Sequence, residues 1–247
     1  MRLLPILVSA FCLSLPASAE VVKEGWSGEG SFSASNSTGN TETTDLGVGL
    51  HMTYKNGRWI SVIDAQADYG ETDGDETENR SYLAGTLDYQ LADRLFAFGK
   101  TSYERDEFSG FESRLFVGGG LGWKIFDTDA LTWSVRGGPG FKIDETRASI
   151  EDGVIVEEAE TVESLSVIGN SQFDYAFNDN VSLSNATSIL YAEESTQFSN
   201  TIALTAALTN SLSGRLSYEW RHDTEPPEGY ENTDTTTRVS IVYKFGG

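Results

Sequence analysis

The sequence predicts an all-β protein, a transmembrane antiparallel up-and-down β-barrel of about twelve strands. Three observations predict it. The chain begins with an export signal, it has no later apolar run long enough for a membrane-spanning helix, and most of the remainder alternates apolar and polar residues. A period of two is typical of a strand with two unlike faces. Such an exported chain is either a soluble β protein or a barrel whose apolar residues face lipid.

Residues 1–19 have the features of a cleaved signal peptide. Arg2 provides a positive start, Leu3 to Leu15 an apolar stretch, and Ala17-Ser18-Ala19 a small-residue cleavage site. We therefore expect a signal peptide at 1–19 and an outer-membrane barrel domain at 20–247. Cys12 is the single cysteine and would leave with the signal, so we expect no disulfide or thiolate metal site in the mature protein.

The expected strands follow one another in segments of roughly ten residues, about the length of a membrane-spanning strand. One clear example is Leu46, Val48, Leu50, Met52 and Tyr54. Short turns are predicted at 55–58, 92–94, 126–130, 178–180 and 209–211, and longer loops at 36–41, 71–79, 106–113, 145–163, 192–196 and 223–234. Short turns on one side and longer loops on the other are typical of bacterial outer-membrane barrels.

A soluble β-sandwich is the alternative that alternation alone leaves open. Three features favour the membrane barrel. The apolar face is long and similar in every segment, aromatic residues gather near segment ends, and the last segment carries Tyr243 and Phe245. Aromatic girdles at both membrane interfaces would account for the second feature.

If the alternating apolar residues face lipid, the charged residues between them face the lumen. A charge facing lipid near the midplane would cost about 2 to 4 kcal/mol, so this sorting supports the assignment. The candidate lumen charges are Arg80, Lys100, Arg114, Arg136, Glu29, Asp45, Asp64 and Asp68. The basic four fall on later segments than the acidic four, which predicts two opposed walls of charge that would orient dipolar solutes.

The formal net charge is −21, and most of the acidic excess lies in the predicted longer loops. The candidate external acidic residues are Asp73, Asp75, Glu76, Glu157, Glu158 and Glu160. They are either solvated loop faces or an acidic rim that binds divalent ions bridging lipopolysaccharide. Asp73-Gly74-Asp75 is too short to be a calcium-loop motif, so no metal site is assigned.

Two longer motifs flank the chain's glycine-rich runs. They are YERDEFSGFESR at 103–114 and DTTTRVSIVYKF at 234–245, with GGGLGW at 118–123 and GGPGF at 137–141 between them. On these motifs the sequence resembles the YdiY-like family of salt-induced outer-membrane proteins, a domain of unknown function. The resemblance covers essentially the whole mature chain. It implies the fold and the location but supplies no activity and no site.

Little in the sequence indicates catalysis or cofactor binding. A membrane-embedded hydrolase would need His51 or His222 beside a serine, and no Gly-x-Ser-x-Gly elbow is present. The glycine runs lack the lysine and following helix of a phosphate loop, so close strand packing or a sharp bend is the better interpretation. We expect no enzyme activity, no cofactor and no nucleic-acid partner, because an acidic protein would be repelled by nucleic acid.

Two functional classes remain after these exclusions. The barrel is either a passive channel for small solutes or ions, with a link to the salt or osmotic response that the family resemblance implies, or a plugged barrel with a structural or surface-interaction role. The expected partners are outer-membrane lipid, lipopolysaccharide and the barrel assembly machinery, and the expected location is the outer membrane. Pore conductance separates the two classes.

Overall fold

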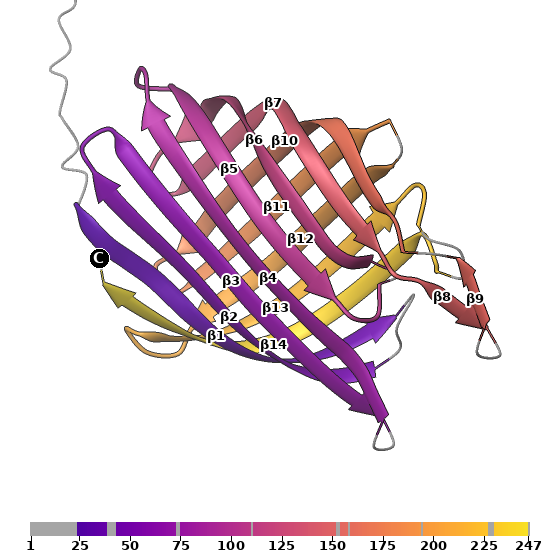
Figure 1. Cartoon of the computed structure of the whole chain (residues 1–247). Coiled ribbons are helices and arrows are strands. Elements are labelled where there is room, and N and C mark those ends of the chain that lie inside the picture. Colours follow the sequence, from indigo (N-terminus) through magenta and orange to yellow (C-terminus); the bar gives the residue numbers. More distant parts are fainter. Residues whose placement is uncertain are drawn as a thin grey trace, which may run out of the picture.

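The computed structural model describes residues 24–38, 43–72, 75–109, 111–151, 154–157, 159–193, 195–226 and 230–246. Within these ranges twelve strands form one closed antiparallel barrel, which confirms the predicted fold class (Figure 1). Its strands are β1 (Gly25–Thr38), β2 (Thr43–Asn56), β3 (Trp59–Thr72), β4 (Asp75–Gln90), β5 (Leu95–Asp106), β6 (Phe111–Asp127), β7 (Leu131–Thr146), β10 (Thr161–Asn178), β11 (Val181–Ala192), β12 (Thr196–Ala207), β13 (Leu212–Asp223) and β14 (Thr233–Gly246). A separate two-stranded sheet consists of β8 (Ser149–Glu151) and β9 (Val154–Glu157).

The barrel closes where the first strand pairs with the last. β1 pairs with β14 from Ser27↔Gly246 to Thr38↔Thr235, so the ring leaves no unpaired strand edge. Every other pair of neighbours is consecutive along the chain except β7 and β10, between which the β8–β9 hairpin is inserted. All backbone groups of a closed ring can bond between strands, which is the condition for crossing lipid.

The two longest connections between barrel strands, at 147–160 and 224–232, lie on the same rim, where the other connections have two to four residues. One rim, called here the short-turn rim, carries the connections at 57–58, 91–94, 128–130, 179–180 and 208–211, and the other is called the long-loop rim. Gly57 in the first short turn has a φ of 57°, a left-handed conformation that favours glycine. The turn that Asn56-Gly57 predicts is therefore present.

The outer face of the barrel is apolar. Many side chains expected to face lipid are more than half exposed, including Leu46, Val48, Leu83, Val117 and Leu121. Aromatic rings pair near the short-turn rim, with centroids 4.8 Å apart for Trp26–Tyr54 and 4.6 Å apart for Trp59–Tyr89. No helix in the described ranges is long and apolar enough to span a membrane.

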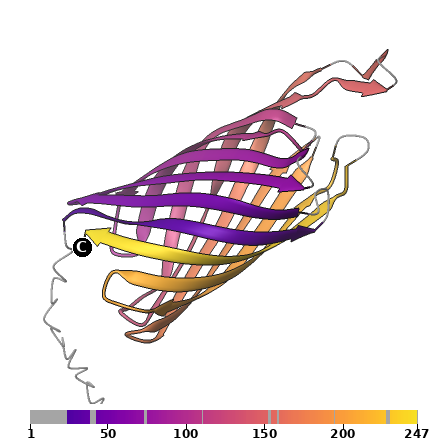
Figure 2. The same ribbon diagram turned by 90° about the horizontal axis from the view of Figure 1, so that it is seen from below.

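The long-loop rim departs from the prediction in two places. The expected loop at 145–163 contains the β8–β9 hairpin, which projects beyond the barrel (Figures 1 and 2). Its strands are too short to produce the alternation used to find the others, although Val154-Ile155-Val156 is rich in β-branched residues. The expected loop at 71–79 is mostly strand, because β3 and β4 remain paired as far as Thr72↔Asp75.

Candidate functional site: the barrel lumen

A cavity of ≈ 660 Å³ occupies the lumen from the long-loop rim to about the middle of the strands. Its lining comes from strands all around the barrel, including Glu29 of β1, His51 of β2, Arg80 of β4 and Arg215 of β13. A second cavity of ≈ 480 Å³ lies at the short-turn rim, lined by residues such as Asp129, Asn178 and Lys244. The two cavities have no lining residue in common among the described residues.

Apolar side chains lie inside the barrel near the floor of the larger cavity. Phe96, Phe98, Phe116 and Ile168 are buried, with 3% to 6% of their surface exposed, and Leu190 packs against them. We call these five residues the apolar cluster. They alternate with outward-facing neighbours, so their burial occurs on the lumen face. Phe116, Ile168 and Leu190 also line the larger cavity.

Glycines on the lumen face of β6 and β7 make room for these rings. A Cβ at Gly122 would collide with the Phe96 ring, and one at Gly118 or Gly140 would collide with the Phe116 ring. The regular pairing of β6 with β7 is also interrupted between Gly118↔Gly140 and Leu121↔Gly137. The glycine runs therefore provide close packing, as the sequence indicated, with the rings taking the place of absent side chains.

Arg136 of β7 connects the apolar cluster to a charge. Its guanidinium carbon lies 5.1 Å from the Phe96 ring centroid and 5.4 Å from that of Phe98. Its Nη1 donates to Asp88 Oδ1 of β4 at 3.0 Å. A cation held over aromatic faces and paired at its other side fixes the ring positions.

Ion pairs bridge the lumen nearer the long-loop rim. Glu104 of β5 accepts from Arg80 Nε at 2.7 Å and from Arg221 Nη1 of β13 at 3.4 Å. Around the ring, β5 is six strands from β13 in either direction. One path is β13-β14-β1-β2-β3-β4-β5, and the other is β13-β12-β11-β10-β7-β6-β5. β5 and β13 therefore lie opposite each other, and the Arg221–Glu104 pair spans the barrel.

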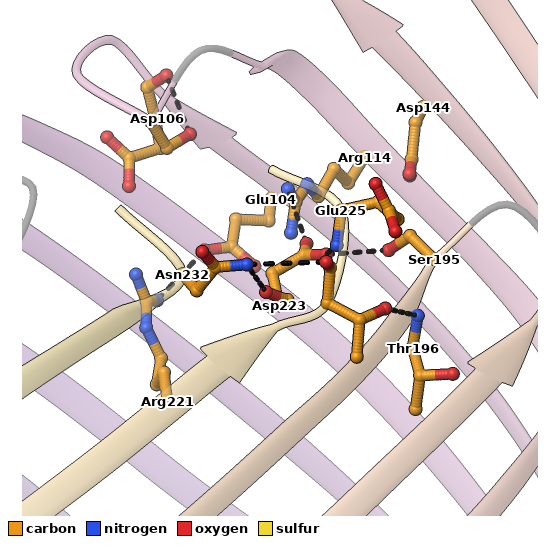
Figure 3. Close-up of polar contacts among 12 residues, drawn as sticks. Glu104, Asp106, Arg114, Asp144, Ser195, Thr196, Arg221, Asp223, Glu225 and Asn232 are labelled. Carbon is orange, nitrogen blue, oxygen red and sulfur yellow. Dashed lines mark hydrogen bonds and ion pairs between the residues drawn. The ribbon is translucent and has the colours of Figure 1, made fainter. Parts of the chain in front are cut away.

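A second bridge joins β6 to the end of β13. Arg114 Nη2 lies 3.3 Å from Asp223 Oδ2, and Figure 3 shows the two side chains pointing toward each other. Ser195 Oγ donates to Asp223 Oδ1 at 2.8 Å, and Asn232 Nδ2 donates to the Asp223 carbonyl at 2.9 Å. These contacts tie the ends of β12, β13 and β14 to the bridge.

The predicted acidic lumen residues lie on β1 to β3 and the predicted basic ones on β4 to β7, and members of both sets form ion pairs. Arg215 makes a bidentate pair with Glu29, at 2.6 and 3.0 Å, and Arg238 Nη2 lies 3.2 Å from Asp68 Oδ2. The strands that carry the predicted basic residues also supply acids, as in Arg80–Glu104. Glu29 and Asp68 are thus paired with arginines of β13 and β14, as buried charges require a nearby partner of opposite sign.

The predicted lumen residues divide into three groups by position. Glu29, Asp64, Arg80, Lys100 and Arg114 line the larger cavity. Asp68 and Arg136 are held in ion pairs outside that lining. Asp45 belongs to β2, but its side chain lies outside the described part of the structure.

The predicted external acidic residues are only partly described. Asp75 and Glu76 are exposed at the start of β4, and Glu160 is exposed just before β10. Asp73, Glu158 and the side chain of Glu157 lie outside the described residues. Where side chains are described, no group of acidic residues, histidines or cysteines has the arrangement of a metal site.

His51 has the closest approach to a catalytic arrangement. Its Nδ1 lies 2.6 Å from Asp64 Oδ1, and its Nε2 lies 3.4 Å from Thr53 Oγ1. Thr53 and His51 are two residues apart on one strand, so they share the lumen face in any case. The contact is the one expected of lumen neighbours, and it does not identify a nucleophile.

The apolar cluster is the feature that sequence reasoning missed. The signal was present, since Phe96, Phe98 and Phe116 stand at lumen positions beside a glycine-rich run. From the sequence, only charged residues are assigned to the lumen face, so these rings are not expected there.

A closed antiparallel barrel with an apolar outer face and a charged interior defines an outer-membrane-type β-barrel protein. The chain belongs to the family described as "Protein of unknown function, DUF481", whose model matches residues 30–245. It is 25% identical over 236 residues to the uncharacterized protein YdiY of Escherichia coli (strain K12), covering 93% of this chain and 86% of that protein.

Solved barrels of low sequence identity share the fold. The translocator domain of the autotransporter NalP from Neisseria meningitidis aligns with a TM-score of 0.57 and 12% identity, covering 90% of this chain and 89% of that one. The COG4313 outer membrane channel from Pseudomonas putida F1 aligns with a TM-score of 0.56 and 10% identity, covering 93% of this chain and 99% of that one. The NanC porin aligns with a TM-score of 0.55 and 13% identity, covering 87% of this chain and 100% of that one.

Proposed function

We propose that this protein is an outer-membrane channel for ions or small polar solutes. The observation that carries the proposal is the ≈ 660 Å³ cavity inside the closed barrel, lined by charged and hydroxyl side chains. A cavity of this size falls within the range of about 300 to 1,000 Å³ that holds small molecules. The likeness to barrels named as a channel and a porin supports the same class.

The proposed channel is narrow. The bridges from Arg221 to Glu104 and from Arg114 to Asp223 divide the lumen, and the apolar cluster lies near the cavity floor. Permeating species must pass between these side chains or displace them. We therefore expect a conductance well below that of wide sixteen-strand porins, whose lumen is an open aqueous channel.

A plugged barrel is the second candidate, and the apolar cluster is the observation that favours it. In that case the exposed acidic residues at the long-loop rim, including Asp75 and Glu76, would contact lipopolysaccharide through divalent ions. Both candidates include export through a cleaved signal, insertion by the barrel assembly machinery and a non-enzymatic role. A link to the salt or osmotic response rests on the family resemblance and is tested by growth of a deletion strain at high salt.

Single-channel conductance of the purified, refolded protein in planar bilayers tests the proposal. The wild type should give discrete small steps, and Phe98→Ala should enlarge them because it shortens a side chain of the apolar cluster. Phe32→Ala, which alters an exposed ring on β1 that lines neither cavity, is the matched control and should leave the steps unchanged. A folded barrel that is silent as wild type and as Phe98→Ala would reject the channel in favour of the plugged barrel.

A further inference from the structure

Lys100 differs from the other basic side chains that line the larger cavity. Arg80, Arg114, Arg215 and Arg221 each form an ion pair. Lys100 lines the same cavity, and among the described residues it forms no ion pair and no side-chain hydrogen bond. Within the described part of the chain, its ammonium group thus has neither an ion-pair nor a hydrogen-bond partner.

The surrounding acids are already occupied. Asp64 is bound to His51, Glu29 to Arg215 in a bidentate pair, and Glu104 to Arg80 and Arg221. None of these carboxylates lies within 4 Å of the Lys100 ammonium, so none of them forms an ion pair with it. Among the described residues that line the cavity, Lys100 is therefore the one lysine or arginine that forms no ion pair.

The position of Lys100 places that charge beside the apolar cluster. It follows Phe98 by two residues on the lumen face of β5. Its cross-strand neighbours are Thr86 of β4 and Gly118 of β6, and glycine contributes no side chain that would cover the ammonium group. Ser102, the next lumen residue along β5, lines the same cavity and adds a hydroxyl donor.

We propose that Lys100 forms an anion-binding site near the floor of the cavity, suited to a halide or to a single carboxylate or phosphate group of a small solute. An unpaired charge inside a barrel is costly, and a mobile counter-ion removes most of that cost. The arginines that line the cavity are held by carboxylates, which leaves the Lys100 ammonium free to bind an anion. If the barrel conducts, as proposed above, this site sets its preference for anions. That role rests on the proposed function, whereas anion binding at Lys100 does not.

Bromide is the probe for the binding site itself. Crystals of the full mature barrel soaked in bromide should show an anomalous peak within hydrogen-bonding distance of the Lys100 Nζ. The peak should be absent in Lys100→Gln and retained in Arg94→Gln, which removes one exposed positive charge from a short turn. Bromide found only at surface cations, or an unchanged peak in Lys100→Gln, would overturn the proposal.

Reversal potentials in a tenfold potassium chloride gradient separate this inference from the proposed function. Lys100→Glu should shift the reversal potential toward cation selectivity, and Arg94→Gln should not. A silent barrel that still holds bromide at Lys100 would reject the channel and keep the binding site. A conducting barrel whose selectivity is unchanged in Lys100→Glu would keep the channel and reject the role of Lys100.

Discussion

The long-loop half of the lumen and its middle are closed by different forces. Near the long-loop rim, opposite walls are joined by charge, as in the Arg221–Glu104 pair at 3.4 Å. In the middle, the buried Phe96 and Phe116 rings lie against backbone glycines. Ion pairs beside a wet cavity can exchange partners with solutes, whereas close apolar packing has no polar alternative. The apolar cluster is therefore the level expected to resist passage most.

A single strand contains both arrangements. On the lumen face of β5 the residues run Phe96, Phe98, Lys100, Ser102 and Glu104, so the wall changes from apolar to charged within a few residues. The neighbouring strand β6 changes character at the same levels, since it pairs Gly122 with Phe96 and Arg114 with Glu104. The difference between the two levels is therefore encoded by matched positions on neighbouring strands.

Truncating Phe116 should have the largest effect on stability. Phe116→Ala removes a buried ring that fills the space over Gly118 and Gly140, and large-to-small changes of this kind cost about 3 to 5 kcal/mol. Urea unfolding of the barrel in lipid vesicles, followed by tryptophan fluorescence, measures the loss. Phe177→Ala at the exposed rim is the control, and equal losses in both variants would show that the apolar cluster is not a packed core.

Adding a methyl group beneath the Phe96 ring should have the next largest effect. Gly122→Ala forces that ring away from β6, and overpacking of this kind costs about 1 to 3 kcal/mol. In Phe96→Ala the same change should cost much less, giving a coupling energy of about 0.5 to 3 kcal/mol in a double-mutant cycle. Gly99→Ala is the matched control, because a Cβ there meets nothing within 4 Å. Additive costs would contradict the contact.

Removing the carboxylate shared by two arginines tests the charged level. Glu104→Gln leaves Arg80 and Arg221 without this partner, and the Arg80 side chain is only 13% exposed. A buried hydrogen-bonding group left without its partner costs about 1 to 3 kcal/mol, and a charged group costs more. Urea unfolding should show this loss, and bilayer recordings should show greater anion selectivity. Glu107→Gln, at an exposed surface pair, should change neither measurement, and the same loss in both variants would refute a special role for the bridge.

The fold could be predicted from the sequence because strand alternation is a local property. Each segment shows its outer face by itself, as Leu46, Val48 and Leu50 do, and Asn56-Gly57 identifies its own turn. The β8–β9 hairpin could not be found in this way, since three or four residues contain too little alternation to distinguish a strand from a loop.

The pairing of the lumen charges could not be predicted from the sequence. Alternation places Arg114 and Arg221 on the inner face, but their partners depend on which strands face each other across the ring and at what height. Those quantities are set by the tilt and stagger of the whole barrel. The apolar cluster depends in the same way on Phe96 meeting Gly122 of the neighbouring strand.

The smallest effect on stability is expected from breaking the exposed Arg105–Glu107 ion pair, which has the same length as the Arg221–Glu104 bridge of the lumen. Arg105 Nη2 lies 3.4 Å from Glu107 Oε1, the same distance as Arg221 Nη1 from Glu104 Oε1. The Arg105 side chain is 51% exposed and the Arg221 side chain 30%, and only Arg221 lines the cavity.

Exposed pairs are screened by water and salt, so Arg105→Gln should cost at most about 0.5 kcal/mol. Arg221→Gln should cost more, because it also leaves Glu104 with fewer donors in a less hydrated place. Urea unfolding of both variants at low and high ionic strength measures the difference. Equal costs would mean that the charged level of the lumen is as solvated as the outer surface, and the contrast between the two levels would then rest on the apolar cluster alone.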